Sequence, residues 1–261
     1  MPKDQTILFH STIFGPIHSR RLGVSLGVNL MPSDGKICSF DCLYCEAGYN
    51  AQGAGRQGLP SAAQVKADLR KKLSEMREAG DPLDVITFSG NGEPTLHPQF
   101  AEVVDIVVAL RDEFYPDAKI SVLTNSTRIF DPAVAAALER VDNNILKLDS
   151  AVEETMRVLD RPNDPAFTVE RVVEGLRRFA GMGIIQTMLL RGTHDGREID
   201  NTTPAEIDAL IRAYKEIRPR EVMLYSIDRS TPEENLCKVS HEELSSIAAR
   251  LREEGIPVAS F

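Results

Sequence analysis

Short apolar runs typical of buried β-strands alternate along this chain with longer runs whose apolar residues recur at helical spacing. In the segment 100–110, for example, Val103, Val104, Val107 and Val108 lie on one side of a helix. The pattern predicts strands over 24–30, 85–89, 119–123, 145–148, 184–190 and 221–226. It predicts helices over 61–79, 100–110, 131–140, 169–180, 203–217 and 240–252, and leaves 256–261 as a short apolar tail.

Residues suited to helix capping support these boundaries. Ser61 and Gln64 have the spacing of a capping box, in which a serine hydroxyl accepts from a backbone N–H three residues later. Thr203 and Glu206 repeat that spacing, and Pro204 suits the first helical turn. Because strands and helices alternate, we expect an α/β fold in which helices lie outside a parallel sheet.

Six strand–helix units predict a partial (β/α)6 barrel, and 261 residues suit a single domain covering residues 1–261. An open α/β sheet is the alternative fold, although no G-x-G-x-x-G sequence follows a predicted strand. In a barrel the strand ends share one face, where active sites form. We therefore expect the residues after the strands to surround one opening: the loop 38–45, the turn 90–93, Asn125, Asp149, Arg191 and Arg229.

Three of the four cysteines lie in one loop, where Cys38, Cys42 and Cys45 have the spacing C-x3-C-x2-C. Each iron of a [4Fe–4S] cluster usually takes one thiolate, so three thiolates leave one iron open to a small molecule. Structural zinc is the alternative, but it needs four ligands, and no second cysteine pair or nearby histidine completes a set. Cys237 stands alone, which argues against a disulfide framework and suggests a small buried or surface residue.

The overall charge narrows the classes of partner. The net charge is −9 and the isoelectric point is about 5.2, whereas nucleic-acid binders usually carry a basic surplus. A nucleic-acid partner is therefore disfavoured, although a local basic patch is compatible with an acidic chain.

The sequence contains no run of about eighteen apolar residues, so no membrane span is expected. The first residues also lack the basic-then-apolar order of a signal peptide. We expect a cytoplasmic protein with no membrane partner.

The cysteine loop, with aromatic Tyr44 directly before its last cysteine, resembles the radical S-adenosylmethionine (radical SAM) superfamily. The run from Gly90 to Pro94 is similar to that family's GGE motif with different spacing. The likeness is closer still to single-domain relatives of the tRNA wyosine-base (4-demethylwyosine) synthase, through the segments 14–23, 92–98 and 225–229. The wyosine enzymes bind a second cluster through further cysteines and often carry a flavodoxin-like domain, and this chain has neither the cysteines nor the length for these.

The resemblance implies a partial barrel of the radical SAM type and two cofactors. Cys38, Cys42 and Cys45 would hold a [4Fe–4S] cluster, and S-adenosylmethionine (SAM) would bind the open iron. Reductive cleavage of SAM gives methionine and a 5′-deoxyadenosyl radical that abstracts hydrogen from the substrate, while the protein orients these groups. The same resemblance places Tyr44 beside the adenine, and core packing is the alternative role for this ring.

Residues at other strand ends are candidates for binding SAM. Gly90 and Gly92 permit close backbone approach or positive φ. The Glu93 carboxylate could hold the SAM ammonium group by a charge-assisted hydrogen bond, or it could be an ordinary turn residue. Asn125 and Ser126 could bond to the ribose or to the methionine carboxylate, or they could cap the local backbone.

Charged residues near the strand ends suggest how a substrate is bound. Asp149 could reach the ribose or the substrate, or it could cap the next helix. Arg20, Arg21, Arg191 and Arg229 flank strands, and guanidinium groups suit carboxylate and phosphate. They suggest an anionic substrate, although surface salt bridges explain any one of them equally well.

The sequence therefore predicts a radical SAM enzyme that acts on an unidentified substrate and receives electrons from a reductant such as flavodoxin or ferredoxin. Two alternatives are a tRNA-modifying enzyme of the wyosine type and a glycyl-radical activase that acts on a protein partner. A third is a non-catalytic electron-transfer or metal-sensing module. The sequence does not identify catalytic residues on the substrate side.

Overall fold

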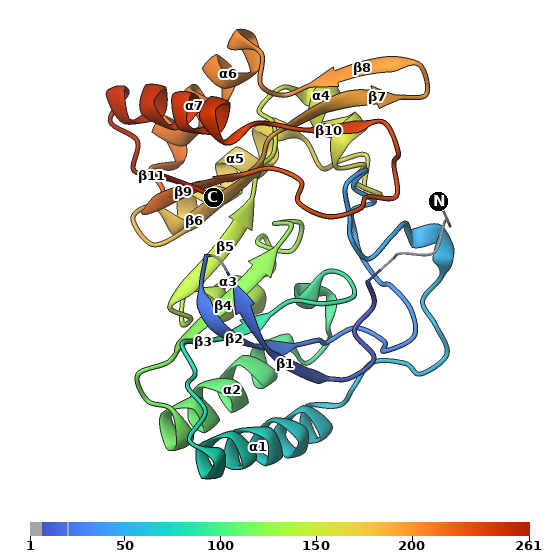
Figure 1. Ribbon diagram of the computed structural model, residues 1–261, viewed down its shortest axis with the longest axis vertical. Coiled ribbons are helices and arrows are strands. Elements are labelled where there is room, and N and C mark those ends of the chain that lie inside the picture. Colours follow the sequence, from blue (N-terminus) through green and yellow to red (C-terminus); the bar gives the residue numbers. More distant parts are fainter. Residues whose placement is uncertain (1–6, 20) are drawn as a thin grey trace.

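Eight strands form one curled sheet in the computed structural model, which describes residues 7–19 and 21–261 (Figure 1). The strand order is β1-β2-β3-β4-β5-β6-β9-β11. The neighbours from β2 to β9 are all parallel, and they are the six strands predicted from the sequence. Because β1 and β11 are the two edges, the barrel is partial, as expected. The strands are β1 (Ile13–Ser19), β2 (Gly23–Val28), β3 (Val85–Phe88), β4 (Lys119–Thr124), β5 (Asn143–Lys147), β6 (Ile184–Met188), β9 (Glu221–Tyr225) and β11 (Val258–Ser260).

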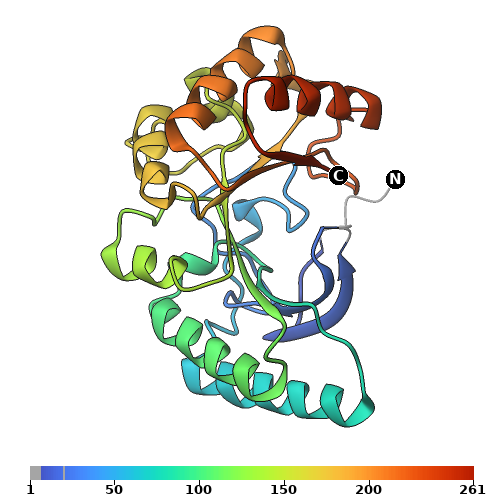
Figure 2. The ribbon, with the colours of Figure 1, turned by 90° about the vertical axis from the view of Figure 1, so that its left-hand side faces the viewer.

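The α-helices lie along the outer face of the curled sheet and leave its inner side uncovered (Figure 2). All six predicted helices are present, with ends that differ from the prediction by a few residues. Three short 3-10 helices accompany them, over Asn50–Gln52, Pro94–Leu96 and Arg177–Phe179. The α-helices are α1 (Ala62–Ala79), α2 (Phe100–Phe114), α3 (Pro132–Leu138), α4 (Glu153–Leu159), α5 (Val169–Leu176), α6 (Pro204–Ile217) and α7 (His241–Glu253).

The predicted helix caps are confirmed at the backbone level. The Ser61 hydroxyl accepts from the N–H of Gln64 at 3.2 Å, and the Thr203 hydroxyl accepts from the N–H of Glu206 at 3.3 Å. The Glu206 side chain does not complete its capping box, because it turns inward and accepts from the Ser150 hydroxyl at 2.6 Å. That contact ties the start of α6 to the segment that follows β5.

The sequence prediction missed both edge strands. β1 contains Pro16 and most of its residues are exposed, so it shows neither an apolar run nor the alternation that predicts a strand. A proline is tolerated there because an edge strand leaves one side of its backbone unpaired. β11 lies in the predicted apolar tail, and its pairing with β9 makes it a strand.

The prediction of a single strand over 184–190 was wrong at its end. β6 ends at Met188, and the chain continues into β7 (Leu190–His194), which pairs with β8 (Arg197–Asp200) and β10 (Leu236–Lys238) in a separate three-stranded sheet. The run is almost entirely apolar, so its hydrophobic pattern does not show where one strand ends and the next begins. The prediction also missed α4, which is short and buries only Met156 and Leu159.

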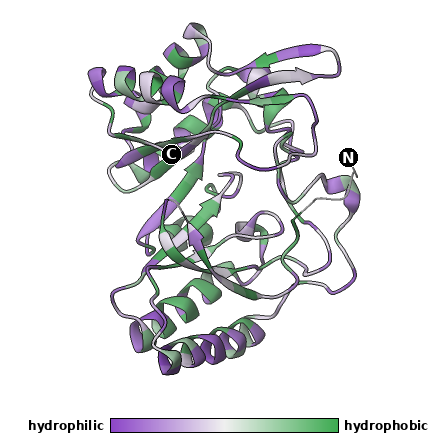
Figure 3. Cartoon of the chain, viewed as in Figure 1, coloured by the Kyte–Doolittle hydropathy of each residue, from purple (hydrophilic) through white to green (hydrophobic). Residues whose placement is uncertain are grey.

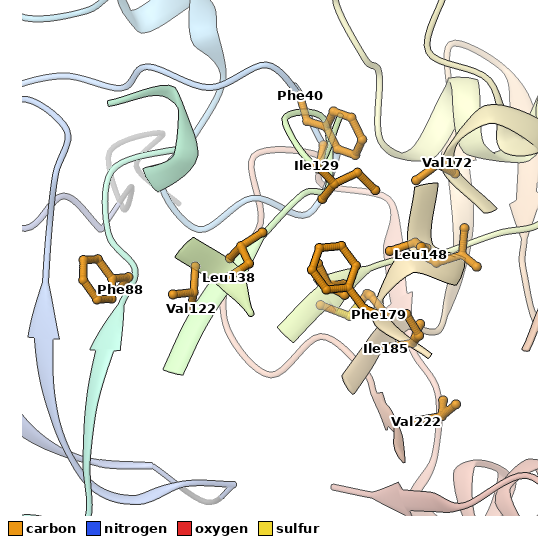
Figure 4. Packing of buried hydrophobic residues seen from close by; sticks show 14 of the residues in the cluster. Phe40, Phe88, Val122, Ile129, Leu138, Leu148, Val172, Phe179, Ile185 and Val222 are labelled. Carbon is orange, nitrogen blue, oxygen red and sulfur yellow. The ribbon is translucent and has the colours of Figure 1, made fainter. Parts of the chain in front are cut away.

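Side chains along each strand alternate between the helix side of the sheet and its inner side. Leu146 of β5 and Ile185 of β6 belong to the main core with helix residues, and Figure 4 shows Ile185 beside Phe179. The neighbouring Ile145 and Ile184 belong to a separate small cluster. Figure 3 shows the outward face of α1 as hydrophilic. Among the described residues, no helix combines the length and the apolar content needed to cross a membrane.

Candidate active site

The cysteine loop follows β2 and is docked onto the end of β3 by backbone pairing. Ile37 and Gly92 form an isolated parallel bridge. The N–H of Ile37 donates to the carbonyl of Asn91 at 3.2 Å, and the N–H of Glu93 donates to the carbonyl of Ile37 at 3.0 Å. Gly92 has a φ of 138°, and a Cβ at this position would overlap the Ile37 carbonyl. The glycine therefore permits the close approach that brings the turn 90–93 against the cysteine loop.

Burial and the neighbouring thiols of the loop affect the ionisation of Cys38 and Cys42. Burial raises the pKa of Cys38 to about 12. Burial, followed by the nearby carboxylate of Asp160, raises the pKa of Cys42 well above its ordinary value. Burial acts to lower the pKa of Lys36, but the sulfurs of Cys45, Cys38 and Cys42 outweigh it and the pKa is raised. Buried thiols next to one another become thiolates when a metal cation offsets their negative charge.

Three thiols in one loop are the donor set that a [4Fe–4S] cluster with one open iron requires. Within residues 7–19 and 21–261, no three His, Cys, Asp or Glu side chains are arranged as the ligands of a single metal ion. A [4Fe–4S] cluster needs a different arrangement, because each thiolate binds a different iron and the sulfurs do not converge on one ion. Cys237 is exposed on β10, opposite Arg191 of β7, and it lies outside this donor set.

The Glu93 carboxylate is buried and accepts hydrogen bonds from several groups of the chain. Its Oε1 accepts from the N–H and the hydroxyl of Thr95 at 3.0 and 2.5 Å and from the Thr124 hydroxyl at 2.7 Å. Its Oε2 accepts from the N–H of Asn125 at 2.7 Å. Burial raises the pKa of Glu93, and these donors oppose that effect. Glu93 therefore joins the ends of β3 and β4. Its Oε2 can accept a further hydrogen bond, and the contact with SAM stays a prediction.

Asn125 contacts the cysteine loop directly. Its Nδ2 donates to Sγ of Cys38 at 3.6 Å and to Oγ of Ser39 at 2.9 Å. Ser126 is fully buried with a φ of 67°, and its hydroxyl donates to the carbonyl of Lys147 at 3.3 Å. The end of β4 thus supports the cysteine loop on one side and β5 on the other.

A buried polar network joins the cysteine loop to β5. The Tyr44 hydroxyl donates to Oδ2 of Asp149 and accepts from Nζ of Lys147 at 2.7 Å. Nζ of Lys147 lies 3.3 Å from the same Asp149 oxygen, and Oδ1 of Asp149 accepts from the N–H of Met188 at 2.9 Å. The alternative that Asp149 caps the next helix is wrong, because the N-cap of α4 is Val152.

Sequence reasoning missed Asp160, which completes this network. Its Oδ1 lies 3.4 Å from the Tyr44 hydroxyl oxygen and 3.7 Å from Sγ of Cys42. Burial is the main cause that raises the pKa of Asp160 well above its ordinary value, and the charge of Asp149 adds to it. Asp160 immediately follows α4, a helix that the hydrophobic pattern did not predict, so no signal in the sequence marked it.

A cavity of about 410 Å³ opens on the inner side of the sheet, next to this network. Residues of β1, β2, β3, β4, β6 and β9 line it, and Tyr44, Cys45 and Gly90 form part of its wall. Gly90 has a φ of 137°, and a Cβ there would crowd the Asn29 side chain. The cysteine loop therefore faces a space that is enclosed by strands from both halves of the sheet.

The predicted arginines lie in different places. Arg21 lines the cavity and its Cζ lies 4.7 Å from the ring centroid of Tyr225. Arg229 also lines the cavity but is held by a glutamate at 2.6 Å. Arg191 was expected at the opening, but it is carried away on β7, where it pairs with a glutamate of α7 at 2.5 Å. Arg20 lies outside the described residues.

Comparison with known proteins agrees with this geometry. Residues 33–202, more than half of the chain, match the family described as the Radical SAM superfamily. A UPF0026 protein of Helicobacter pylori is 30% identical over 222 residues, which cover 83% of this chain and 66% of that protein. This chain therefore spans slightly less than two thirds of the length of that relative.

Two solved structures show the same fold at low sequence identity. A radical SAM methyltransferase from Sphaerobacter thermophilus has a TM-score of 0.66 at 19% identity, with 91% of this chain and 65% of that chain covered. TYW1 with a lysine–pyruvate adduct bound has a TM-score of 0.59 at 17% identity, with 88% of this chain and 73% of that chain covered. At these identities the likeness concerns the fold alone.

Proposed function

The chain belongs to the radical SAM superfamily, whose enzymes use a [4Fe–4S] cluster and SAM, and we propose that it cleaves SAM reductively to act on a substrate in the cavity. The observation that carries the proposal is the position of Cys38, Cys42 and Cys45 in one loop whose last cysteine lines the cavity. When bound, the cluster supplies the electron that breaks the C5′–S bond of SAM, giving methionine and the 5′-deoxyadenosyl radical that takes hydrogen from the substrate.

The residues around the loop have separate tasks in this proposal. Cys38, Cys42 and Cys45 hold the cluster. The Asn125 amide donates to Sγ of Cys38, and such hydrogen bonds to sulfur tune the potential of an iron–sulfur cluster. The backbone bridge at Gly92 keeps the loop in place.

The strand ends beside the loop hold SAM. Gly90 and Glu93 lie at the end of β3, where Oε2 of Glu93 is the acceptor for the SAM ammonium group. Ser126 and Asp149 lie at the next strand ends and would support the ribose side of bound SAM. The Tyr44 ring forms part of the cavity wall, and there it would pack against the adenine.

The electron donor in this proposal is a flavodoxin or a ferredoxin, and the substrate occupies the part of the cavity away from the cysteine loop. Wyosine-type tRNA modification and activation of a protein partner are alternatives with the same first step. The non-catalytic module is the alternative without that step.

The test is anaerobic reconstitution with iron and sulfide, followed by incubation with SAM and dithionite. We expect 5′-deoxyadenosine and methionine in equal amounts by liquid chromatography and mass spectrometry. Cys38→Ser, Cys42→Ser and Cys45→Ser should abolish both products, whereas the matched control Cys237→Ser should form them like the wild type. Absence of both products from reconstituted wild type would indicate the non-catalytic module.

Two additions to the same assay separate the alternatives. Unmodified tRNA that accelerates 5′-deoxyadenosine formation would indicate wyosine-type chemistry. A glycyl-radical signal in the electron paramagnetic resonance (EPR) spectrum of an added protein would indicate an activase. A screen of metabolites for SAM-dependent loss covers the remaining substrate classes.

A further inference from the structure

The Arg21 guanidinium lies in the wall of the cavity and has no ion-pair partner among the described residues. Its Cζ lies 4.7 Å from the centroid of the Tyr225 ring, and its backbone belongs to the turn between β1 and β2. Nη1 of Arg21 is buried and has no hydrogen-bond partner among the described residues. A buried guanidinium N–H without an acceptor is unfavourable, so this geometry needs an acceptor that the described residues do not supply.

The other charged groups in the cavity wall are already neutralised by neighbours. Glu46 pairs with Arg229 at 2.6 Å, and Asp228 pairs with Lys238 at 2.7 Å. Within residues 7–19 and 21–261, no carboxylate lies within ion-pair distance of Arg21. The described lining therefore carries one uncompensated positive charge, and it lies at Arg21.

Arg21 approaches the cavity from the end of β2 opposite to the cysteine loop. It precedes β2, which begins at Gly23, whereas Cys38 comes after that strand. Arg21 lies against the Tyr225 ring, whereas Tyr44 is contacted by the Lys147 ammonium. Arg21 is therefore placed on the substrate side of the cavity, away from the residues proposed to bind SAM.

We propose that the substrate carries a carboxylate or phosphate group and that Arg21 binds this group inside the cavity. The inference rests on the proposed function, because it assigns the cavity to the substrate of the radical reaction. A guanidinium suits this task because it presents a planar pair of donors to an oxyanion. The Tyr225 ring beneath it holds the guanidinium plane in position by a cation–π contact.

The test is calorimetric titration of inorganic phosphate and, separately, acetate into the reconstituted, SAM-saturated enzyme at low ionic strength. Wild type, Arg21→Gln, Arg21→Lys and Arg191→Gln are compared. Arg191 is the matched control because its guanidinium is held by Glu243 outside the cavity lining. We expect Arg21→Gln to raise the dissociation constant by about tenfold or more, Arg21→Lys to give an intermediate value, and Arg191→Gln to match the wild type.

The two probes separate the two sources of the oxyanion, since a phosphate-selective effect assigns a phosphate and an acetate effect assigns a carboxylate. Equal affinity in wild type and Arg21→Gln, or no binding of either probe to wild type, overturns the proposal. A loss of SAM affinity in Arg21→Gln, with probe binding unchanged, also overturns it, because Arg21 would then serve the cofactor. Melting temperatures verify folding, and 5′-deoxyadenosine formation in all four proteins tests the proposed function independently.

Discussion

Gly92 at the end of β3 and Ile37 at the start of the cysteine loop are paired through their backbones, with no room for a side chain on Gly92. This contact explains why position 92 is a glycine, since any side chain there would prevent the two backbones from approaching each other. It also joins the two motifs that the sequence singled out, because the GGE-like turn becomes part of the wall that supports the cysteines.

Replacing Gly92 by alanine should therefore damage the loop itself. Gly92→Ala adds both overlap with the Ile37 carbonyl and a strained backbone, so we expect the free energy of unfolding to fall by about 3 kcal/mol or more. Gly58→Ala is the matched control, because Gly58 has a φ of 70° but nothing within 4 Å of the added Cβ. That control should lose about 1 kcal/mol. Urea unfolding measures both, and equal losses would contradict the steric explanation.

Iron content tests the number of clusters. The loop holds three of the four cysteines, so we expect one cluster, with about four irons and four sulfides per chain after anaerobic reconstitution. Removal of the iron by a chelator should abolish SAM cleavage, and renewed reconstitution should restore it. Colorimetric iron and sulfide analysis checks this, and about eight irons per chain with a second cluster spectrum would show that another site was missed.

Glu93 should serve both the fold and SAM. Glu93→Ala leaves the Thr124 hydroxyl and the Asn125 N–H without their acceptor, which should lower the free energy of unfolding by about 3 kcal/mol. Glu93→Gln keeps part of these contacts and should lose less. Both should retain the cluster and weaken SAM binding by about tenfold, measured by EPR titration of the reduced cluster. If stability falls and SAM affinity does not, Glu93 has only a structural role.

Lys147 should be required for the buried network beside the cluster loop. Lys147→Met leaves the buried Asp149 carboxylate without its cation, and removing one partner of a buried ion pair lowers stability by about 3–5 kcal/mol. Lys215→Met is the control, because its pair with Glu254 is half exposed and exposed pairs contribute little to stability. Chemical denaturation compares the two variants, and similar losses in both would contradict this assignment.

Local spacing in the sequence was sufficient for several features. The loop containing Cys38, Cys42 and Cys45, the six parallel strands and the helix caps at Ser61 and Thr203 were all predicted. Each of these depends on residues a few positions apart, so side-chain period and short-range hydrogen bonding determine them.

The sequence also indicated which residues follow the strands, and thus which could gather at one face. It could not show their partners. Glu93 was predicted at a strand end, but its bonds to Thr124 and Asn125 depend on the register between β3 and β4. Arg191 follows an apolar run, yet the chain leaves the sheet before it and takes its guanidinium out of the cavity lining.

Only the tertiary structure decided the network around Tyr44 and the position of Arg21. The hydrogen bond from Tyr44 to Asp149 joins residues 105 positions apart, and Asp160 reaches the same hydroxyl from a loop after a helix without a clear pattern. Arg21 meets Tyr225 because the sheet curls until β1, β2 and β9 face one cavity. Sequence spacing encodes local geometry, whereas contacts across a curled sheet arise from how its strands pair and twist.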